Sequence, residues 1–527
     1  MLIGVVLLSL IFILSVLVFQ GGVVSYSLGS AYLFFGDISL HFSSGISSSM
    51  LLMLLCCSIL SLCYAFHYLD EYSYGKILAV SMFMFSTVMV VLVLSYEVVS
   101  TLILWEYLGL VSFLLILYYG VWSCYRGGVV TLVSSRFGDV ALFFLLAFYI
   151  TGSGSSCLVS LCILLVVATK SALFPFSSWL LEAMRAPTPV SSLVHSSTLV
   201  AAGIWFYLEY SQVMNCFEGC SLLYSFSMAC ALLTILISGT YSLICNDIKQ
   251  SIALSTCSNI SWVVVMMLLG EYDLGLVQLV IHGLSKCLVF ILVGDYISGG
   301  FGGQNVNQVM VSFLGCLREF VYLFTLLFGL SGFPFIRIYF SKHAFISSIG
   351  GYNVFNVCLV IVIILCVLLS VVYSLRLFFL FDGGGVSNVI SIRRFYSISL
   401  YLPLLSSVLG YSYLFSLVVG YTDLFCYQSM LLSVVYIVGL IVGFGFVVGY
   451  WKISGCDNFG GMNSLVVLFN GLMYTFSDLI SFVVFRWEIA LFNYLYRLLS
   501  SLVLGWYMGL VVLVLSILML VVIVLSI

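Results

Sequence analysis

Charged and titratable side chains occur inside apolar stretches of this 527-residue chain. Lys170 and His195 fall in ATKSALFPFSSWLLEAMRAPTPVSSLVHSSTLVAAG. His282 and Lys286, in IHGLSKCLVF, are four residues apart and would share one face of a helix. A charge in hydrocarbon costs at least ~2.5–3.5 kcal/mol on the insertion scale, and packing alone does not explain several such charges. We therefore expect these side chains to line a path for ions or protons.

Two apolar stretches contain helix-breaking residues. The stretch that carries Lys170 and His195 holds three of the five prolines in the chain, including Pro175, close to Lys170. A further stretch, SGFPFIRIYFSKH, is interrupted at Pro334 and reaches Lys342. A proline leaves a helix carbonyl without its partner, which is tolerated at membrane depth only where protein or a water-filled cavity satisfies it. A broken helix beside a lysine is typical of an ion or proton path.

Four further charges lie in or near apolar segments. Glu106, in LWEYLGLVSFLL, requires a cation as its partner. Arg136 and Asp139 are three residues apart and can pair on one helix, either as part of a site or as a structural clamp. Lys249 follows an expected helix start in NDIKQ, where its side chain would either serve the path or extend to the membrane interface.

Composition sets the class of protein. Hydrophobic residues make up 64% of the chain and charged residues 7%, with a mean hydropathy of +1.29. These values predict an all-α polytopic membrane protein, and the net charge of −3 argues against nucleic-acid binding. The 17 cysteines are scattered through apolar runs without zinc or iron–sulfur spacing, and no phosphate-binding glycine motif is present. We expect no nucleotide, flavin or metal cluster in this chain.

Apolar runs of about 20 residues predict roughly 15 membrane-spanning segments. Their expected bounds are 2–20, 47–65, 76–95, 97–118, 128–150, 157–186, 190–208, 222–244, 249–270, 274–298, 320–346, 354–380, 397–418, 430–451 and 504–526. The broken helices are the sixth and eleventh segments. Because five-helix units insert in opposite orientations, residues 97–244 and 249–418 are candidate inverted repeats after an N-terminal part over 1–96.

The tail departs from this pattern. Residues 462–503 contain charges yet no proline, and they are too long for one span. They predict a lateral amphipathic helix near the membrane plane, before the last span within 504–527. Two ordinary spans are the alternative.

Six motifs now indicate a family. LWEYLGLVSFLLI, SRFGD, the long proline-containing stretch, NDIKQSIALSTCSN, HGLSK and FPFIRIYFSK resemble, in order and spacing, mitochondrial NADH–ubiquinone oxidoreductase chain 5. That family forms the distal antiporter-like subunit of the complex I membrane arm. The resemblance is strong over about residues 90–380 and extends to the tail by architecture alone. The residue bias is similar to that of an invertebrate mitochondrial genome.

The resemblance implies a function and specific residue roles. Glu106 would pair with Lys170, and His195, Lys286 and Lys342 would form a hydrophilic axis with His282 beside it. Protons would move through this axis in the mitochondrial inner membrane. NADH, FMN, iron–sulfur clusters and ubiquinone would bind elsewhere in the complex, whose other subunits and lipids, cardiolipin included, would be the partners.

The sequence also departs from the family. One helix fewer precedes the glutamate helix, and the family's Ser-Lys-Asp reads Ser341-Lys342-His343. We therefore expect a compensating carboxylate or water near Lys342, with His343 directed toward solvent or a lipid headgroup. A subunit of a related multisubunit cation/proton antiporter and a purely structural subunit are the rival functions. The former would lack the lateral helix, and the latter would have no need of the buried lysines.

Overall fold

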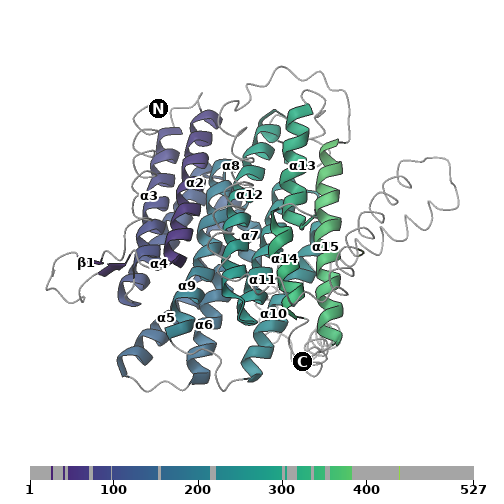
Figure 1. Cartoon of the computed structure of the whole chain (residues 1–527). Coiled ribbons are helices and arrows are strands. Elements are labelled where there is room, and N and C mark those ends of the chain that lie inside the picture. The colour runs from purple at the N-terminus through teal and green to yellow at the C-terminus, as the bar shows by residue number, and fades with distance from the viewer. Residues whose placement is uncertain are drawn as a thin grey trace, which may run out of the picture.

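The computed structural model describes most of the first 382 residues. The described residues are 25–27, 39–41, 45–69, 75–95, 98–151, 156–213, 221–299, 303–304, 317–333, 337–349, 357–382 and 438. Apart from one antiparallel pair of short strands, in which Ser25 pairs with His41, the elements are helices packed side by side (Figure 1). Eight of the described helices are long and apolar enough to cross a membrane. The all-α membrane architecture expected from composition is confirmed.

The helices follow the apolar segments of the sequence closely. The elements are β1 (Ser25–Ser27), β2 (Ser39–His41), α2 (Gly45–Tyr68), α3 (Gly75–Leu94), α4 (Val98–Ile116), η1 (Leu117–Tyr119), α5 (Trp122–Thr151), α6 (Ser156–Lys170), α7 (Ser178–Ala183), α8 (Thr188–Leu193), η2 (Val194–Thr198), α9 (Leu199–Val213), α10 (Ser221–Ser242), α11 (Ile248–Leu268), α12 (Tyr272–Gly299), α13 (Leu317–Ser331), α14 (Ile338–Ile349) and α15 (Val357–Asp382). The second to twelfth expected segments therefore have helical counterparts.

Both expected helix breaks are present, and their first arms end in the same way. After α6, Ala172 adopts a φ of +55° and the Leu173 N–H donates to the Ala168 carbonyl at 3.0 Å. After α13, Gly332 adopts a φ of +88° and the Phe333 N–H donates to the Phe328 carbonyl at 3.1 Å. A left-handed residue with a hydrogen bond spanning five residues is the Schellman termination of a helix. At each break, the first arm therefore ends in a regular helix C-terminus with its own terminating hydrogen bond.

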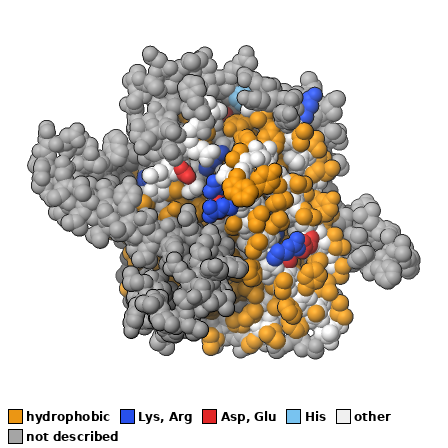
Figure 2. All heavy atoms as spheres, turned by 180° about the vertical axis from the view of Figure 1, so that it is seen from behind, with side chains coloured by type: hydrophobic (Ala, Val, Ile, Leu, Met, Phe, Trp, Pro, Cys, Tyr) orange, Lys and Arg blue, Asp and Glu red, His pale blue; other side chains and the backbone are white. Residues whose placement is uncertain are grey.

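Helices α11 and α12 occupy the interior of the bundle. Their most apolar windows are 94% and 89% buried, against 33% for α5. The outer surface is apolar too, as Figure 2 shows for the face opposite to that of Figure 1, where hydrophobic side chains cover most of the described area. An apolar exterior around interior helices is what a lipid-facing bundle requires.

Glycines allow α2 to lie close against α12. A Cβ added to Gly283 would come within 2.5 Å of the Met53 sulfur, and one added to Gly294 would collide with the Tyr64 hydroxyl. Both pairs differ by 230 in residue number, so α2 and α12 run in the same direction with a fixed register. This seam places the first described helix against the one that carries His282 and Lys286.

Several expectations fall outside the described residues. These are the segments at 2–20, 397–418 and 504–526, all of 430–451 except Val438, the lateral helix over 462–503, and Pro334 at the second break. The domain limits and the inverted relation of the two five-helix units stay predictions.

Candidate functional site

The first break holds Lys170 at the end of a helix. Lys170 is the last residue of α6, and only 2% of its surface is exposed. The exposed carbonyls and the dipole at a helix C-terminus favour a cation there. Trp179 on α7 donates from its indole nitrogen to the Thr169 carbonyl at 2.9 Å, which joins the two arms. Pro175 lies between the arms, following a cis peptide bond.

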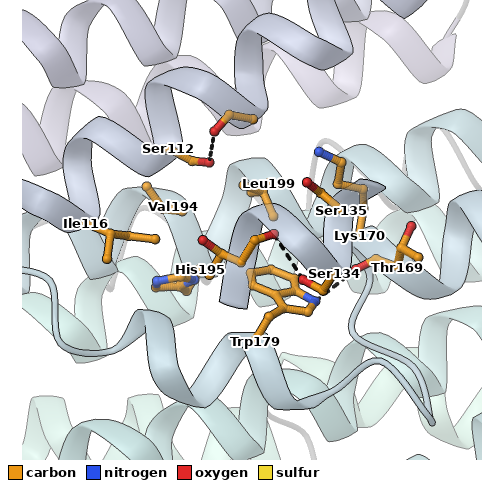
Figure 3. Close-up of a pocket in the computed structure, with 12 residues that line it drawn as sticks. Ser112, Ile116, Ser134, Ser135, Thr169, Lys170, Trp179, Val194, His195 and Leu199 are labelled. Carbon is orange, nitrogen blue, oxygen red and sulfur yellow. Dashed lines mark hydrogen bonds between the residues drawn. The ribbon is translucent and has the colours of Figure 1, made fainter. Parts of the chain in front are cut away.

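Lys170 and His195 line the same cavity. His195 is fully buried in η2, a single π-helical turn between α8 and α9. Figure 3 shows the cavity with side chains from α4, α5, α6, α7, η2 and α9 converging on it. Its lining consists of Gly109, Ser112, Ile116, Thr131, Ser134, Ser135, Thr169, Lys170, Trp179, Val194, His195 and Leu199. Five of these are hydroxyl residues, which can both donate and accept hydrogen bonds to water.

Glu106 pairs with Arg136 rather than with Lys170. The Arg136 guanidinium lies 2.7 and 2.6 Å from the two oxygens of Glu106 and 3.4 Å from Asp139. Lys170 forms no ion pair within the described part of the chain. The expected direct Glu106–Lys170 pair is therefore wrong for this structure, because a guanidinium on the adjacent helix binds both carboxylate oxygens at once. The expected Arg136–Asp139 pair is present.

Lys249 is buried inside the bundle. Only 3% of its surface is exposed, and its ammonium donates to the Ala186 carbonyl at 3.3 Å. Ala186 immediately precedes Pro187, the N-cap of α8, so its carbonyl lies outside the hydrogen-bond pattern of that helix. The alternative in which Lys249 extends to the membrane interface is therefore wrong, because the lysine supplies a hydrogen bond at the start of α8.

Lys286 has polar partners on α11. Its ammonium donates to the Ile252 carbonyl at 3.0 Å and also to the Ser255 hydroxyl. His282 lies one turn earlier on α12, as expected, and is fully buried. Neither ring nitrogen of His282 has a hydrogen-bond partner among the described residues.

The second break surrounds Lys342, which is fully buried on α14. Its ammonium donates to the Ser331 carbonyl at 3.2 Å and to the Ser370 hydroxyl at 3.3 Å. In the described residues no carboxylate pairs with it, so the expected acidic compensation is replaced by a carbonyl and a hydroxyl. His343 is half-buried, with its ring centroid 5.2 Å from that of Tyr339. Part of its ring therefore packs against protein, whereas we expected it to be directed toward solvent or a lipid headgroup.

Some contacting residues were not recognised in the sequence. Ser255 and Ser370 are single serines among many in apolar helices, and the Ser331 carbonyl carries no side-chain signal at all. Trp105 lies under the Lys170 ammonium at 5.1 Å, and Trp262 under that of Lys342 at 5.6 Å, both measured to the ring centroid. Only the adjacency of Trp105 to Glu106 hinted at its place.

Comparisons with known proteins give the family. A family model described as NADH:quinone oxidoreductase/Mrp antiporter, TM, matches residues 95–372. NADH-ubiquinone oxidoreductase chain 5 of Aedes aegypti is 31% identical over 83% of this chain and 77% of its own length. The Locusta migratoria chain 5 is 32% identical, over 62% of this chain. This chain covers only 60% of that locust protein.

A solved structure has the same fold. A chain of respiratory complex I from Thermus thermophilus superimposes with a TM-score of 0.67 and 17% identity, over 83% of this chain and 94% of that one. The broken helices and buried lysines described above thus occur in a chain that belongs to the NADH:quinone oxidoreductase/Mrp antiporter transmembrane family, within the NADH-ubiquinone oxidoreductase chain 5 group.

Proposed function

We propose that this chain is the proton-translocating membrane subunit of a respiratory NADH:ubiquinone reductase. NADH oxidation and ubiquinone reduction, at cofactors bound in other subunits, would drive protons through it. The names of the relatives support this assignment, and they favour it over a free-standing cation/proton antiporter. The mitochondrial inner membrane is the proposed location. The partners are the other membrane-arm and accessory subunits, with cardiolipin among the lipids.

One observation carries the proposal: both broken helices present a buried lysine to groups other than carboxylates. Lys170 faces a hydroxyl-lined cavity, and Lys342 faces a carbonyl and a hydroxyl. A carboxylate in direct contact would favour the ammonium form of a lysine and make the loss of its proton harder. A serine hydroxyl accepts from the ammonium and donates to the neutral amine, so it accommodates both protonation states. Such lysines can gain and lose protons.

The buried groups offer successive positions for a proton. Lys170 and His195 share the cavity, and η2 packs against α12, where a Cβ on Gly283 would lie 3.4 Å from the Ser197 Cβ. On α12, His282 and Lys286 follow, and α12 packs against α14, which carries Lys342. We infer that water joins these groups into a route. Imidazole suits the relay because its unperturbed pKa is ~6.5.

Glu106 would act on Lys170 at longer range. Opposite charges attract and like charges repel, so Glu106 and Asp139 would favour the charged form of Lys170 and Arg136 would oppose it. Because Arg136 holds Glu106, any shift of that guanidinium changes the field at Lys170. In this form the acidic residue controls the lysine without a direct ion pair.

A matched pair of lysine variants tests the function. In the assembled complex reconstituted into vesicles, Lys286→Met should lower NADH-driven proton uptake, while reduction of an artificial acceptor at the flavin continues. Lys76, which is exposed, provides the control, and Lys76→Met should pump normally. Normal uptake in Lys286→Met would refute the proposal. Uptake that requires a sodium gradient rather than NADH would favour the antiporter.

A further inference from the structure

Each broken helix sets its lysine against the face of a buried tryptophan. The Lys170 ammonium lies 5.1 Å from the centroid of Trp105 on α4. The Lys342 ammonium lies 5.6 Å from the centroid of Trp262 on α11. Both indoles are only 1% exposed, so each contact is shielded from water. Distances below about 6 Å from ammonium to ring centroid are those of cation–π interactions.

The two contacts occupy corresponding places in the chain. Helices α4 and α11 are the first segments of the two five-segment units expected from the sequence. The broken helices that carry the lysines are the third segment of each unit. Lys249 and Lys286, which lie elsewhere in the units, donate to carbonyls, and Lys286 also to a hydroxyl, but neither lies over an aromatic ring among the described residues. Among the described residues, the tryptophan contact is therefore found only at the lysines that lie at a helix break.

An indole face differs from a carboxylate in what it does to a proton. The negative face of the ring attracts the ammonium, and the attraction strengthens when water is excluded. The ring carries no full charge and offers no lone pair that competes for the proton. It therefore stabilises the charged lysine in a buried site yet lets the lysine become neutral. Neither lysine has a carboxylate in direct contact among the described residues, and the indole face is the partner that the two lysines share.

We propose that Trp105 and Trp262 are positioning residues that hold the proton-carrying ammonium of Lys170 and of Lys342 at the two helix breaks. The proposal rests on the proposed function, because it assigns these rings a part in the same proton route. It predicts that what matters at both positions is an aromatic face rather than hydrophobic volume.

The experiment compares aromatic with aliphatic replacements in the assembled complex. Trp105→Leu and Trp262→Leu should each lower NADH-driven proton uptake roughly tenfold, the order expected for a desolvated cation–π contact. Their remaining activity should require a more acidic medium than the parent complex, by roughly one pH unit, because the ammonium has lost its partner. Trp105→Phe and Trp262→Phe keep a ring and should recover most of the uptake.

A third buried tryptophan provides the control. Trp205 on α9 is fully buried, and its ring contacts Tyr210 with no lysine over it among the described residues. Trp205→Leu removes the same volume and should leave the pH profile of uptake unchanged, even if it lowers the yield of complex. A pH shift in Trp205→Leu equal to that in Trp105→Leu would overturn the proposal.

A lysine variant separates the two proposals. If Lys170→Met pumps normally, the proposed function itself fails. If Lys170→Met abolishes pumping while both leucine variants match the parent in rate and pH profile, only the role of the tryptophans fails. Equal loss in the leucine and phenylalanine variants, without a pH shift, would also reject that role, because volume alone would then explain it.

Discussion

The Lys342 ammonium donates a hydrogen bond to the main-chain carbonyl of Ser331 across the second helix break. Ser331 is the last residue of α13, so its carbonyl has no partner within its own helix. Ser370 on α15 donates to the same carbonyl at 3.0 Å and lies 3.3 Å from the lysine. The end of one helix arm thus supplies the polar group that the lysine on the other arm requires.

Ser370→Ala should slow proton uptake. It leaves Lys342 with the Ser331 carbonyl and the Trp262 ring, and it removes a hydrogen bond from a charged donor, worth about 1.5–3 kcal/mol. Ser370→Thr, which retains the hydroxyl, should pump nearly normally. Ser86 is a suitable control because it is half-buried on α3 and, among the described residues, its hydroxyl bonds only to the Phe83 carbonyl of its own helix. If Ser370→Ala and Ser86→Ala pump equally well in vesicles, the hydroxyl has no part in the route.

Gly283→Ala should destabilise the subunit. The new Cβ would lie 2.5 Å from the Met53 sulfur, and overpacking of this kind typically costs about 1–3 kcal/mol. Gly109→Ala is the matched change, since its Cβ would meet nothing within 4 Å. Thermal inactivation of the purified complex should occur at a lower temperature in Gly283→Ala than in the parent, and at an unchanged temperature in Gly109→Ala. Adding Met53→Ala to it should restore part of the loss; no restoration would contradict the close contact between α2 and α12 at this register.

Arg376→Leu should loosen the packing of α15 against α10. The Arg376 guanidinium donates to the Ser242 carbonyl at 2.5 Å and to the Cys245 carbonyl at 3.0 Å, at the C-terminal end of α10. Hydrogen bonds from a charged donor contribute about 1.5–3 kcal/mol, so their loss should lower the amount of assembled complex. Proton uptake per assembled complex should stay normal, because this arginine contacts none of the axis lysines. A full yield of Arg376→Leu complex would contradict this bracing role.

The sequence predicted the elements of the site better than their pairing. Prolines located the first break, and Gly332 with Pro334 located the second, because proline cannot continue a helix. Glycine alone is a weaker signal, since Gly283 lies inside α12. The Glu106–Lys170 pair failed for a different reason. Which cation reaches Glu106 depends on how α4 and α5 are rotated about their axes, and periodicity does not fix that rotation in segments apolar on all sides.

The tryptophan contacts depend on the same rotation. Trp105 and Trp262 could equally have faced lipid, and nothing in their spacing assigned them to a lysine. Lys249 is a case in which the usual position of the residue type gave the wrong expectation. A lysine near a helix start ordinarily extends to the interface, and only the packing of α8 against the bundle shows that its partner is the Ala186 carbonyl.

Replacement of a central lysine by arginine tests most directly whether these buried lysines release protons. Arginine keeps the positive charge and cannot be deprotonated in a protein. Complex carrying Lys286→Arg should therefore assemble and reduce artificial acceptors at the flavin, yet translocate fewer protons for each NADH oxidised. The measurement is the ratio of protons translocated to NADH consumed in sealed vesicles. A ratio below that of the parent complex is the predicted result, and a ratio equal to the parent's would contradict proton transfer through Lys286.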